Sequence, residues 1–540
     1  MPVCSMLPDV YIEDLPVHTL IFRSASESPW KTAFIEAETG RAYTYGELKI
    51  LSYRFAAVLQ ERNLAKEDVL ALILPNCPQF MIAFLGTSLS GGVCTTVNPN
   101  FTKYEIQNQL YDSAAKFLVT NESLLSTVLA ATTQLSNQLK TIFVVNCKST
   151  KLSTLVVDFD HSLKSLTGYN VSTVEILPRT DTVLLPYSSG TTGLPKGVQL
   201  THYNIVATYT VCVNRTFFLF PTASDSWLSY LPMYHVYGFM TQIMALAEGC
   251  RCITMAKFVP ELFLKTIQDY KIWYIISVPP VLIFLAKSPM AGKFDLKCLK
   301  MIQSGAAPVG KEITQNLMDR LPDLKFFCQS YGMTELAGIA VLAPPTPRDE
   351  TPFGSAGILA SNFKCKIIDP ETGEEVHGPN KKGEICLQSV CIMKGYLNNP
   401  AATEKTIDKD GYLHTGDIGY FDEEGFFYIV DRLKDMIKVK GVQVAPAELE
   451  DVLLSHPEIQ DAAVVRVSEQ PSMEVPKAFV VRKTDNSALT EQLVHQFVRE
   501  RLSREKQLSG GIEFVQYIPK SPSGKILRRL LVKDSQKAKL

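Results

Sequence analysis

The sequence predicts an α/β protein: a large body of helix-covered sheets, then a small all-β unit, then a compact C-terminal domain. Three observations lead to this prediction. The chain of 540 residues exceeds what one hydrophobic core usually organises, so at least two domains are expected. Helical and β-branched segments alternate through the first part, which is the pattern of a sheet covered by helices. Short strands separated by turns interrupt this alternation before it returns near the C-terminus.

The first part begins with a clear helix signal. Thr44-Tyr-Gly-Glu47 is a capping box, in which hydroxyl and carboxylate satisfy free amides at the start of a helix that runs to about Arg62. A buried strand at Val69–Leu74 follows, then a helix from about Gln79 and a β-branched run ending near Val97. This order predicts parallel strands.

The second part, from about Gly354 to Tyr428, is expected to be a small all-β unit. Its turns fall at Asp369-Pro370, Gly378-Pro379 and Glu424-Gly425, between short strands. We expect it to pack against the α/β body.

The last part, after Val430, returns to an αβ pattern. Pro446 suits the first turn of a helix, and strands are expected at Val464–Val467 and Phe479–Val481. A later helix is expected to bury one apolar face, made of Leu493, Val494, Phe497, Val498 and Leu502. We therefore predict two domains, residues 1–430 and 431–540.

Composition narrows the class of protein. Hydrophobic residues make up 46% of the chain, and 54 basic side chains balance 55 acidic ones, which gives no indication of a nucleic-acid partner. The twelve cysteines show no metal or disulfide spacing and are expected to be reduced. The N-terminus has no secretory signal pattern, and the longest apolar run, Ile272–Ala286, is too short to cross a bilayer. We expect a soluble protein without a transmembrane segment.

The segment Tyr187–Gly197 has the chemistry of a phosphate-binding loop. Glycines let backbone amides approach phosphate oxygens, hydroxyls donate further hydrogen bonds, and a lysine adds positive charge. The candidate ligands are Ser188, Ser189, Gly190, Thr191, Thr192, Gly193 and Lys196. Two residues separate Gly193 from Lys196, which excludes the P-loop spacing of nucleotide triphosphatases. The alternative is a flexible surface turn.

This loop resembles the signature of the adenylate-forming superfamily, which includes acyl-CoA synthetases, 4-coumarate-CoA ligases and beetle luciferases. Later motifs of that superfamily recur in order along nearly the whole chain, and the 4-coumarate-CoA ligase-like branch fits best. They are Gln329-Ser-Tyr-Gly-Met-Thr-Glu335, Tyr412-Leu-His-Thr-Gly-Asp417, Asp431-Arg-Leu-Lys434, Gly441-Val-Gln-Val-Ala-Pro446 and Pro519-Lys-Ser-Pro-Ser-Gly-Lys525. The resemblance implies a large N-terminal body with a small β-barrel and a mobile α+β C-terminal lid.

The resemblance also implies a first half-reaction in which ATP converts a carboxylic acid into its acyl-adenylate. Lys525 matches the lysine that bridges the carboxylate and the α-phosphate, and Glu335 matches the residue that holds Mg²⁺. The other implied nucleotide ligands are Gln329, Tyr331, Gly332, Thr334, Asp417 and Arg432, with Tyr331 stacked on adenine and Asp417 and Arg432 at the ribose. Such a reaction depends on positive charge and hydrogen-bond donors placed around phosphorus.

A second half-reaction with coenzyme A is implied by the C-terminal motifs. Lys434 corresponds to a hinge about which the lid rotates, so that Lys438, Gly441 and Gln443 replace Lys525 at the site. A lysine-rich turn that is simply solvated is the alternative.

The acyl pocket is expected around small, apolar and aromatic residues. His235 matches a histidine at the mouth of the acyl tunnel, and the implied pocket residues are Tyr237, Ala306, Ile339 and Val341. They favour a medium- or long-chain fatty acid or an aryl-alkanoic acid. The stretch Gly383–Ser389 begins like a 4-coumarate ligase signature but lacks its Cys-Ile-Arg-Gly ending, which argues against a true coumarate ligase.

We therefore expect an ATP- and Mg²⁺-dependent acyl-CoA synthetase. Two alternatives stay open: a luciferase-like enzyme that oxidises the adenylate, and a catalytically silent nucleotide-binding homologue. The final tripeptide, Ala538-Lys539-Leu540, is close to the Ser-Lys-Leu address that peroxisomal import receptors read. It predicts a peroxisomal location, and an accidental match is the alternative.

Overall fold

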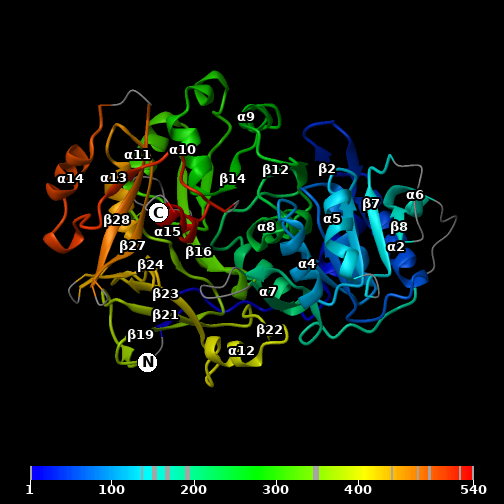
Figure 1. The fold of residues 1–540 in the computed structure, drawn as a ribbon. Coiled ribbons are helices and arrows are strands. Elements are labelled where there is room, and N and C mark those ends of the chain that lie inside the picture. Colours follow the sequence, from blue (N-terminus) through cyan, green and yellow to red (C-terminus); the bar gives the residue numbers. More distant parts are fainter. Residues whose placement is uncertain are drawn as a thin grey trace.

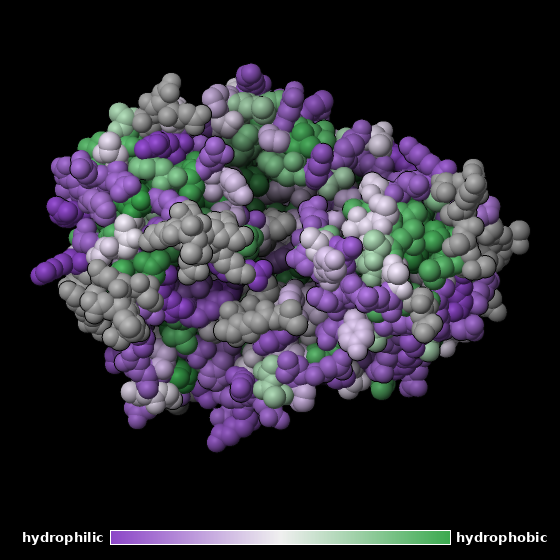
Figure 2. Space-filling model, in the orientation of Figure 1, coloured by the Kyte–Doolittle hydropathy of each residue, from purple (hydrophilic) through white to green (hydrophobic). Residues whose placement is uncertain are grey.

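The computed structural model describes residues 3–135, 138–148, 155–164, 171–188, 195–344, 352–439, 442–470, 473–484, 488–521 and 524–537 (Figure 1). Helices and sheets are mixed throughout, so the α/β prediction is confirmed. No helix within the described ranges has the length and apolar character needed to cross a membrane. The visible face is mainly hydrophilic, with hydrophobic residues in separate groups (Figure 2).

The largest sheet lies in the N-terminal part and has nine strands within the described ranges, in the order β10-β11-β9-β5-β4-β6-β7-β8 with β22 added to β11. Strands β4 to β8 pair in parallel, as the alternation predicts. The strands are β4 (Val69–Leu72), β5 (Val93–Thr96), β6 (Phe117–Asn121), β7 (Thr141–Val145), β8 (Val156–Asp158), β9 (Thr182–Leu184), β10 (Tyr187–Ser188), β11 (Lys196–Thr201) and β22 (Gly395–Tyr396).

Helices bury both faces of this sheet. Successive residues of β4 belong to different hydrophobic clusters: Leu70 and Leu72 pack with α2 and α3, whereas Ala71 packs with α4 and α5. The helices are α2 (Tyr45–Glu61), α3 (Pro78–Leu89), α4 (Lys103–Asp112), α5 (Leu125–Thr132) and α6 (Phe159–Lys164). The expected capping box of Thr44 and Glu47 is formed at the start of α2. Burial on both faces explains why these strands are continuously apolar.

Two smaller sheets and a central group of helices complete the α/β body. One sheet has the order β12-β13-β2-β3, and the other, β14-β15-β16-β17-β18, is parallel through β16 and antiparallel beyond it. The strands are β2 (Thr32–Glu36), β3 (Ala42–Thr44), β12 (Ser226–Ser229), β13 (Arg251–Thr254), β14 (Tyr274–Ser277), β15 (Met301–Ser304), β16 (Phe326–Met333), β17 (Gly338–Leu342) and β18 (Ile358–Leu359). The helices are α1 (Val17–Glu27), α7 (His202–Cys212), α8 (Val236–Ala247), α9 (Pro260–Asp269), α10 (Pro279–Lys287) and α11 (Lys311–Arg320). The apolar run at 272–286 forms β14 and α10, inside this body.

The expected all-β unit is an antiparallel sheet in the order β1-β19-β21-β23-β24, with β20 paired to β19. Within the described residues, β1 and β24 stand at the two ends of this strand order and do not pair with each other. The sheet is therefore open, whereas the resemblance implies a closed barrel. A bridge from Gly357 to Phe427 connects it to the strands around β18. The elements are β1 (Val3–Cys4), β19 (Lys364–Ile368), β20 (Glu375–Val376), β21 (Gly383–Gln388), β23 (Leu413–Phe421), β24 (Phe427–Arg432) and the helix α12 (Pro400–Thr406).

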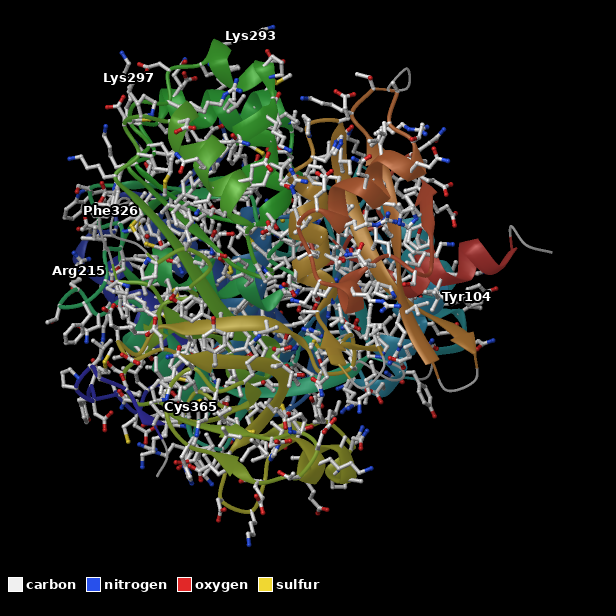
Figure 3. All side chains as sticks on the ribbon, turned by 90° about the vertical axis from the view of Figure 1, so that its left-hand side faces the viewer. Tyr104, Arg215, Lys293, Lys297, Phe326 and Cys365 are labelled. Atoms are coloured by element: carbon white, nitrogen blue, oxygen red, sulfur yellow. The ribbon has the colours of Figure 1, made fainter. Side chains whose placement is uncertain are left out.

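The C-terminal part packs beside α10 and α11 in Figure 3 and has its own core. Its strands are β25 (Ile437–Val439), β26 (Val442–Val444), β27 (Ile459–Gln470), β28 (Met473–Arg482) and β29 (Ile512–Phe514), and its helices are α13 (Pro446–Leu454), α14 (Glu491–Arg499) and α15 (Arg528–Lys537). Pro446 opens α13 as expected. In α14, Val494 and Val498 are buried, but the prediction for Leu493 was wrong. Leu493 is 48% exposed because it lies beside the buried stripe rather than on it.

Candidate active site

The ends of the predicted phosphate loop are held by a short hairpin. Tyr187 pairs with Gly197 and Ser188 with Lys196 across β10 and β11. Ser189, Gly190, Thr191, Thr192 and Gly193 lie outside the described residues. The Lys196 ammonium lies 4.6 Å from the centre of the Tyr396 ring. The hairpin therefore presents a cation at the base of the loop.

Tyr396 also joins this cation to the predicted metal ligand. Its hydroxyl donates a 2.9 Å hydrogen bond to Glu335 Oε1, and the Met393 amide donates to the Glu335 carbonyl oxygen. Glu335 is only 6% exposed. The sequence analysis missed Tyr396, which lies two hundred positions after Lys196 in the chain. The two residues come together because β22 pairs with β11. A buried carboxylate that shares Tyr396 with the Lys196 cation fits Mg²⁺, which takes one or two carboxylates and completes its shell with water and phosphates.

A second cluster assembles three predicted nucleotide ligands. The Tyr331 hydroxyl donates a 2.7 Å hydrogen bond to Asp417 Oδ2, and Arg432 Nε lies 3.5 Å from Asp417 Oδ1. Asp417 and Arg432 face each other across β23 and β24. Burial raises the pKa of Asp417, and the Arg432 charge opposes this shift. The cluster holds a carboxylate and a guanidinium where the resemblance places the ribose.

Backbone crowding around Tyr331 requires a glycine next to it. A Cβ on Gly332 would lie 1.8 Å from the Gly338 carbonyl oxygen, at a β-bulge between β16 and β17. Thr334 follows at the start of a short 3₁₀ turn, half-buried beside Glu335. The Gln329 side chain accepts a hydrogen bond from the Val309 amide. The motif therefore forms the end of β16 and a short 3₁₀ turn, and its polar side chains contact different partners.

Lys525 reaches this site from the C-terminal part. Its loop passes so close to α10 that a Cβ on Gly524 would lie 2.8 Å from Pro280 Cδ, and Gly524 has a φ of +83°. Burial, and then the charges of Arg432 and Lys434, lower the pKa of Lys525 to about 8. Asp417 acts in the opposite direction. The Lys525 ammonium is therefore close enough to Arg432, Lys434 and Asp417 for their charges to act on it.

His235 is close enough to Lys525 to respond to its charge. It occupies the N-cap of α8, and its Nδ1 accepts a 3.4 Å hydrogen bond from the Tyr237 amide. Burial, with a smaller contribution from Lys525, lowers the pKa of His235 to about 4. His235 is therefore a neutral imidazole at neutral pH. Burial also raises the pKa of the Tyr237 phenol, which packs against Gly305.

The residues predicted for the second half-reaction lie in a different place. Lys438 pairs with Gln443 across β25 and β26, and both line a cavity of about 150 Å³ with Pro370, Glu371, Leu433, Met436, Arg466 and Glu474. Lys438 Nζ lies 3.6 Å from Glu371, and the Lys438 amide donates to Glu474. Gly441 lies outside the described residues. Burial lowers the pKa of Lys434, which precedes this hairpin. The structure thus brings Lys525 to the site and leaves Lys438 and Gln443 apart from it.

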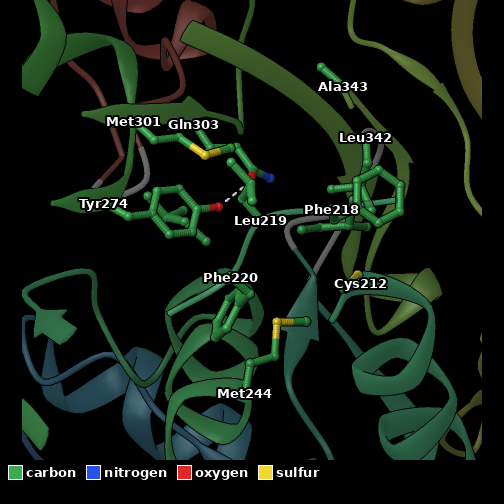
Figure 4. A pocket seen from close by; sticks show the side chains of 12 residues that line it. Cys212, Phe218, Leu219, Phe220, Met244, Tyr274, Met301, Gln303, Leu342 and Ala343 are labelled. Atoms are coloured by element: carbon green, nitrogen blue, oxygen red, sulfur yellow. Dashed lines mark hydrogen bonds between the residues drawn. The ribbon is translucent and has the colours of Figure 1, made fainter. Parts of the chain in front are cut away.

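An apolar cavity lies between α8 and the strands β14, β15 and β17 (Figure 4). Its lining is Cys212, Phe218, Leu219, Phe220, Met244, Tyr274, Ile276, Met301, Gln303, Ile339, Leu342 and Ala343. The Tyr274 hydroxyl donates a hydrogen bond to Gln303 Oε1 within it. Of the predicted pocket residues, Ile339 lines this cavity, whereas Val341 is buried outside the lining. Ala306 is an exposed turn residue with a φ of +70°.

Comparison with known proteins agrees with this geometry. The profile of the AMP-binding enzyme family matches residues 21–397, and that of the AMP-binding enzyme C-terminal domain matches residues 448–525. The chain belongs to the AMP-binding enzyme family. These two matches fall on either side of the predicted boundary at 430/431.

Relatives and solved structures cover nearly the whole chain. 4-Coumarate–CoA ligase 1 of Arabidopsis thaliana is 40% identical over 97% of this chain and 94% of its own length. The o-succinylbenzoate CoA synthetase of Bacillus subtilis with its acyl-adenylate has a TM-score of 0.80 at 26% identity, covering 96% of this chain and 98% of that one. The anthranilate CoA ligase AuaEII has the same fold, with a TM-score of 0.85 at 23% identity and 98% coverage of both chains. The enzyme is an ATP-dependent, AMP-forming acid–CoA ligase of the 4-coumarate-CoA ligase-like branch.

Proposed function

We propose that the acid is a hydrophobic monocarboxylic acid, either a medium- or long-chain fatty acid or an aryl-alkanoic acid. The observation that carries this proposal is the cavity of Figure 4, whose lining residues include no charged side chain. A second carboxylate or an ammonium group on the substrate would be desolvated there without a partner. The Tyr274–Gln303 pair is the polar contact within the lining, and it is neutral.

The position of the cavity along α8 indicates the length of the acid. His235 caps the helix near Lys525, and Met244 lies in the cavity wall nine residues further along. At ~1.5 Å per residue, this separation is about 13 Å along the helix axis. An acid that reacts beside His235 and reaches Met244 therefore carries an extended chain or an aryl group on a short linker.

The cavity must widen to accept such an acid. Its free volume is about 20 Å³, which is room for about one water molecule. Met244 and Met301 are in the lining, and unbranched methionine side chains change rotamer more easily than branched ones. We therefore expect substrate entry to involve rotamer changes of these two methionines.

Adenylation then follows from the charges at the site. The acid's carboxylate attacks the α-phosphorus and pyrophosphate leaves, while Lys525 holds the carboxylate and α-phosphate oxygens together. Asp417 and Arg432 orient the ribose, and Lys196 lies where the leaving phosphates collect. Mg²⁺, held by Glu335, supplies further positive charge to those phosphates when it is bound. No side-chain nucleophile is needed.

Thioester formation requires another arrangement of the C-terminal domain. Lys525 holds the carboxylate and the α-phosphate in the first half-reaction, so the coenzyme A thiol gains access when the domain rotates about Lys434. Rotation withdraws the Lys525 loop from Pro280 and brings Lys438 and Gln443 from their own cavity to the adenylate. The thiol sulfur then attacks the acyl carbon, and AMP leaves with one oxygen of the original acid.

A hydroxylated aryl-propenoic acid is a second candidate. The relatives named as 4-coumarate–CoA ligases favour it, and so does Gln303, whose amide lies in the cavity wall and suits a phenol. The two candidates differ in whether a hydroxyl at the far end of the acid raises or lowers the rate.

A screen of pyrophosphate release tests the proposal. Fatty acids of increasing length, aryl-alkanoic acids, 4-coumarate and dicarboxylic acids are supplied with ATP and Mg²⁺, with and without coenzyme A. We expect the highest kcat/KM for hydrophobic monocarboxylic acids, with thioester formed only when coenzyme A is present. Preference for dicarboxylic acids would refute the substrate proposal, and light or oxidised product instead of thioester would support luciferase-like chemistry. Lys525→Ala is the control for adenylation-dependent signal.

We also propose that the enzyme acts in peroxisomes. The support is the final tripeptide Ala538-Lys539-Leu540, which lies outside the described residues and resembles a peroxisomal address. A fluorescent fusion at the N-terminus should be punctate with this tripeptide and diffuse without it. Unchanged localisation after its removal would refute the proposal.

A further inference from the structure

Three potential metal ligands meet on the antiparallel sheet, outside the nucleotide site. Cys386 of β21 lies directly opposite His414 of β23. Glu384 is two residues before Cys386, so its side chain points to the same face of the strand. Within the described residues, these side chains form a group whose ligand atoms all lie within 4.8 Å of one another. The adenylation and thioester steps assign no role to this group.

Two of the separations between these atoms are close to those of tetrahedral zinc coordination. His414 Nδ1 lies 3.0 Å from Glu384 Oε2 and 3.4 Å from Cys386 Sγ. Zinc bonds of about 2.0–2.3 Å in a tetrahedron separate neighbouring ligand atoms by about 3.3–3.6 Å. Small side-chain movements therefore suffice to seat an ion between the three atoms.

We propose that Glu384, Cys386 and His414 bind a Zn²⁺ ion. A thiolate, an imidazole and a carboxylate form a ligand set that zinc accepts, whereas Mg²⁺ and Ca²⁺ favour oxygen ligands. The Cys386 thiol proton passes to solvent as the sulfur bonds to the metal. The His414 side chain is 33% exposed, so an ion and its water ligand reach the site from the surface.

An outer hydrogen bond holds one of the ligands in place, and a further carboxylate lies near another. The Gly416 amide donates a 3.0 Å hydrogen bond to Glu384 Oε1, which leaves Oε2 directed at His414. The other ring nitrogen of His414 lies 3.9 Å from Asp408, so this carboxylate adds negative charge near the ring without a hydrogen bond to it. Lys366 is a nearby cation whose charge would oppose metal binding, but its ammonium lies over the Tyr412 ring, 3.9 Å from the ring centre. The local carboxylates favour a cation at this place.

The ion would brace the part of β23 that precedes Asp417, a predicted nucleotide ligand. Glu384 contacts both His414 and Gly416, and Asp417 follows Gly416 in β23. A metal bound to Glu384 and His414 would join β21 to the start of β23. Because zinc binds the folded state, its addition raises the melting temperature of the protein.

Cobalt substitution in the full-length protein tests the site. After treatment with a chelator, Co²⁺ should bind with about one ion per chain and give a thiolate-to-cobalt charge-transfer band that zinc removes. Cys386→Ser should abolish the band, and His414→Gln should weaken zinc binding by at least about tenfold. Cys365→Ala is the matched control, because Cys365 is buried on the neighbouring strand and lies outside the group (labelled in Figure 3). Excess Mg²⁺ should leave the band unchanged.

Two results would overturn the proposal. One is a protein that shows no charge-transfer band with cobalt and no shift in melting temperature with zinc. The other is a band that persists in Cys386→Ser, which would place the metal on another cysteine. Circular dichroism and melting curves of the metal-free variants show that they are folded.

Glu384→Gln provides a second test, because it preserves shape and should weaken zinc binding while keeping the cobalt–thiolate band.

Discussion

Replacing Lys525 with alanine should separate the two half-reactions. Burial and the charges of Arg432 and Lys434 lower the pKa of Lys525 from 10.5 to about 8. This lowering corresponds to about 3 kcal/mol, which is the free energy by which the closed site without substrates disfavours the ammonium. The negative charges of the substrate carboxylate and the α-phosphate remove this penalty. The Lys525 ammonium therefore interacts strongly with the negative charge that develops in the transition state. We expect Lys525→Ala to lower kcat for adenylation by about 10²–10³-fold, the usual effect of losing one such donor.

Two assays measure the steps separately. Adenylation is followed as pyrophosphate release in a single turnover without coenzyme A, and thioester formation is followed from supplied acyl-adenylate and coenzyme A. We expect Lys525→Ala to retain the second activity. Lys438→Ala should show the opposite pattern, because its ammonium lies beside Glu371 in this structure and reaches the adenylate only after the domain rotates. Equal losses in both assays for Lys525→Ala would refute the division of labour between the two lysines.

Three further predictions follow from groups around this site and in the core. Gly524→Ala should lower the rate of pyrophosphate release at least about tenfold, because a left-handed φ and a contact with the first turn of α10 both oppose the methyl group; an unchanged rate would contradict the closed geometry. The kcat/KM for ATP should fall as pH rises through about 8, because Lys525 loses its proton there, and Lys434→Gln should move this fall to higher pH by removing a nearby cation. Burial lowers the pKa of His18 to about 4 and that of His202 to about 3, so below pH 6.5 the unfolded state binds more protons than the folded state. The urea midpoint should therefore fall between pH 6.5 and 4, and fall less in His18→Gln; equal falls in both proteins would contradict this assignment.

Local sequence signals predicted the elements that depend on local physics. The capping box at Thr44 and Glu47, the proline that opens α13 and the alternation that gives parallel strands are all present. Each depends on residues close together in the chain, so a single sequence contains the information. The exposure of Leu493 was missed because the edge of an apolar helical face is set by what packs against it, which the sequence of α14 does not contain.

The candidate site was predictable where motifs define it and not where distant strands meet. Tyr331, Asp417 and Arg432 were chosen by resemblance, and the structure joins them through one hydrogen bond and one ion pair. Tyr396 had no motif to indicate it, although it contacts Lys196 and Glu335. The cavity residues were missed because they come from separate helices and strands, and only Ile339 among the predicted residues lines the cavity of Figure 4.

Oxygen labelling tests most directly whether activation passes through an acyl-adenylate. The enzyme is incubated with an acid that carries ¹⁸O in both carboxylate oxygens, together with ATP, Mg²⁺ and coenzyme A. Mass spectrometry then measures how many ¹⁸O atoms each product contains. Attack of the carboxylate on the α-phosphorus predicts one ¹⁸O in AMP, one in the thioester and none in pyrophosphate. Unlabelled AMP, or label in a released phosphate, would contradict the adenylate mechanism.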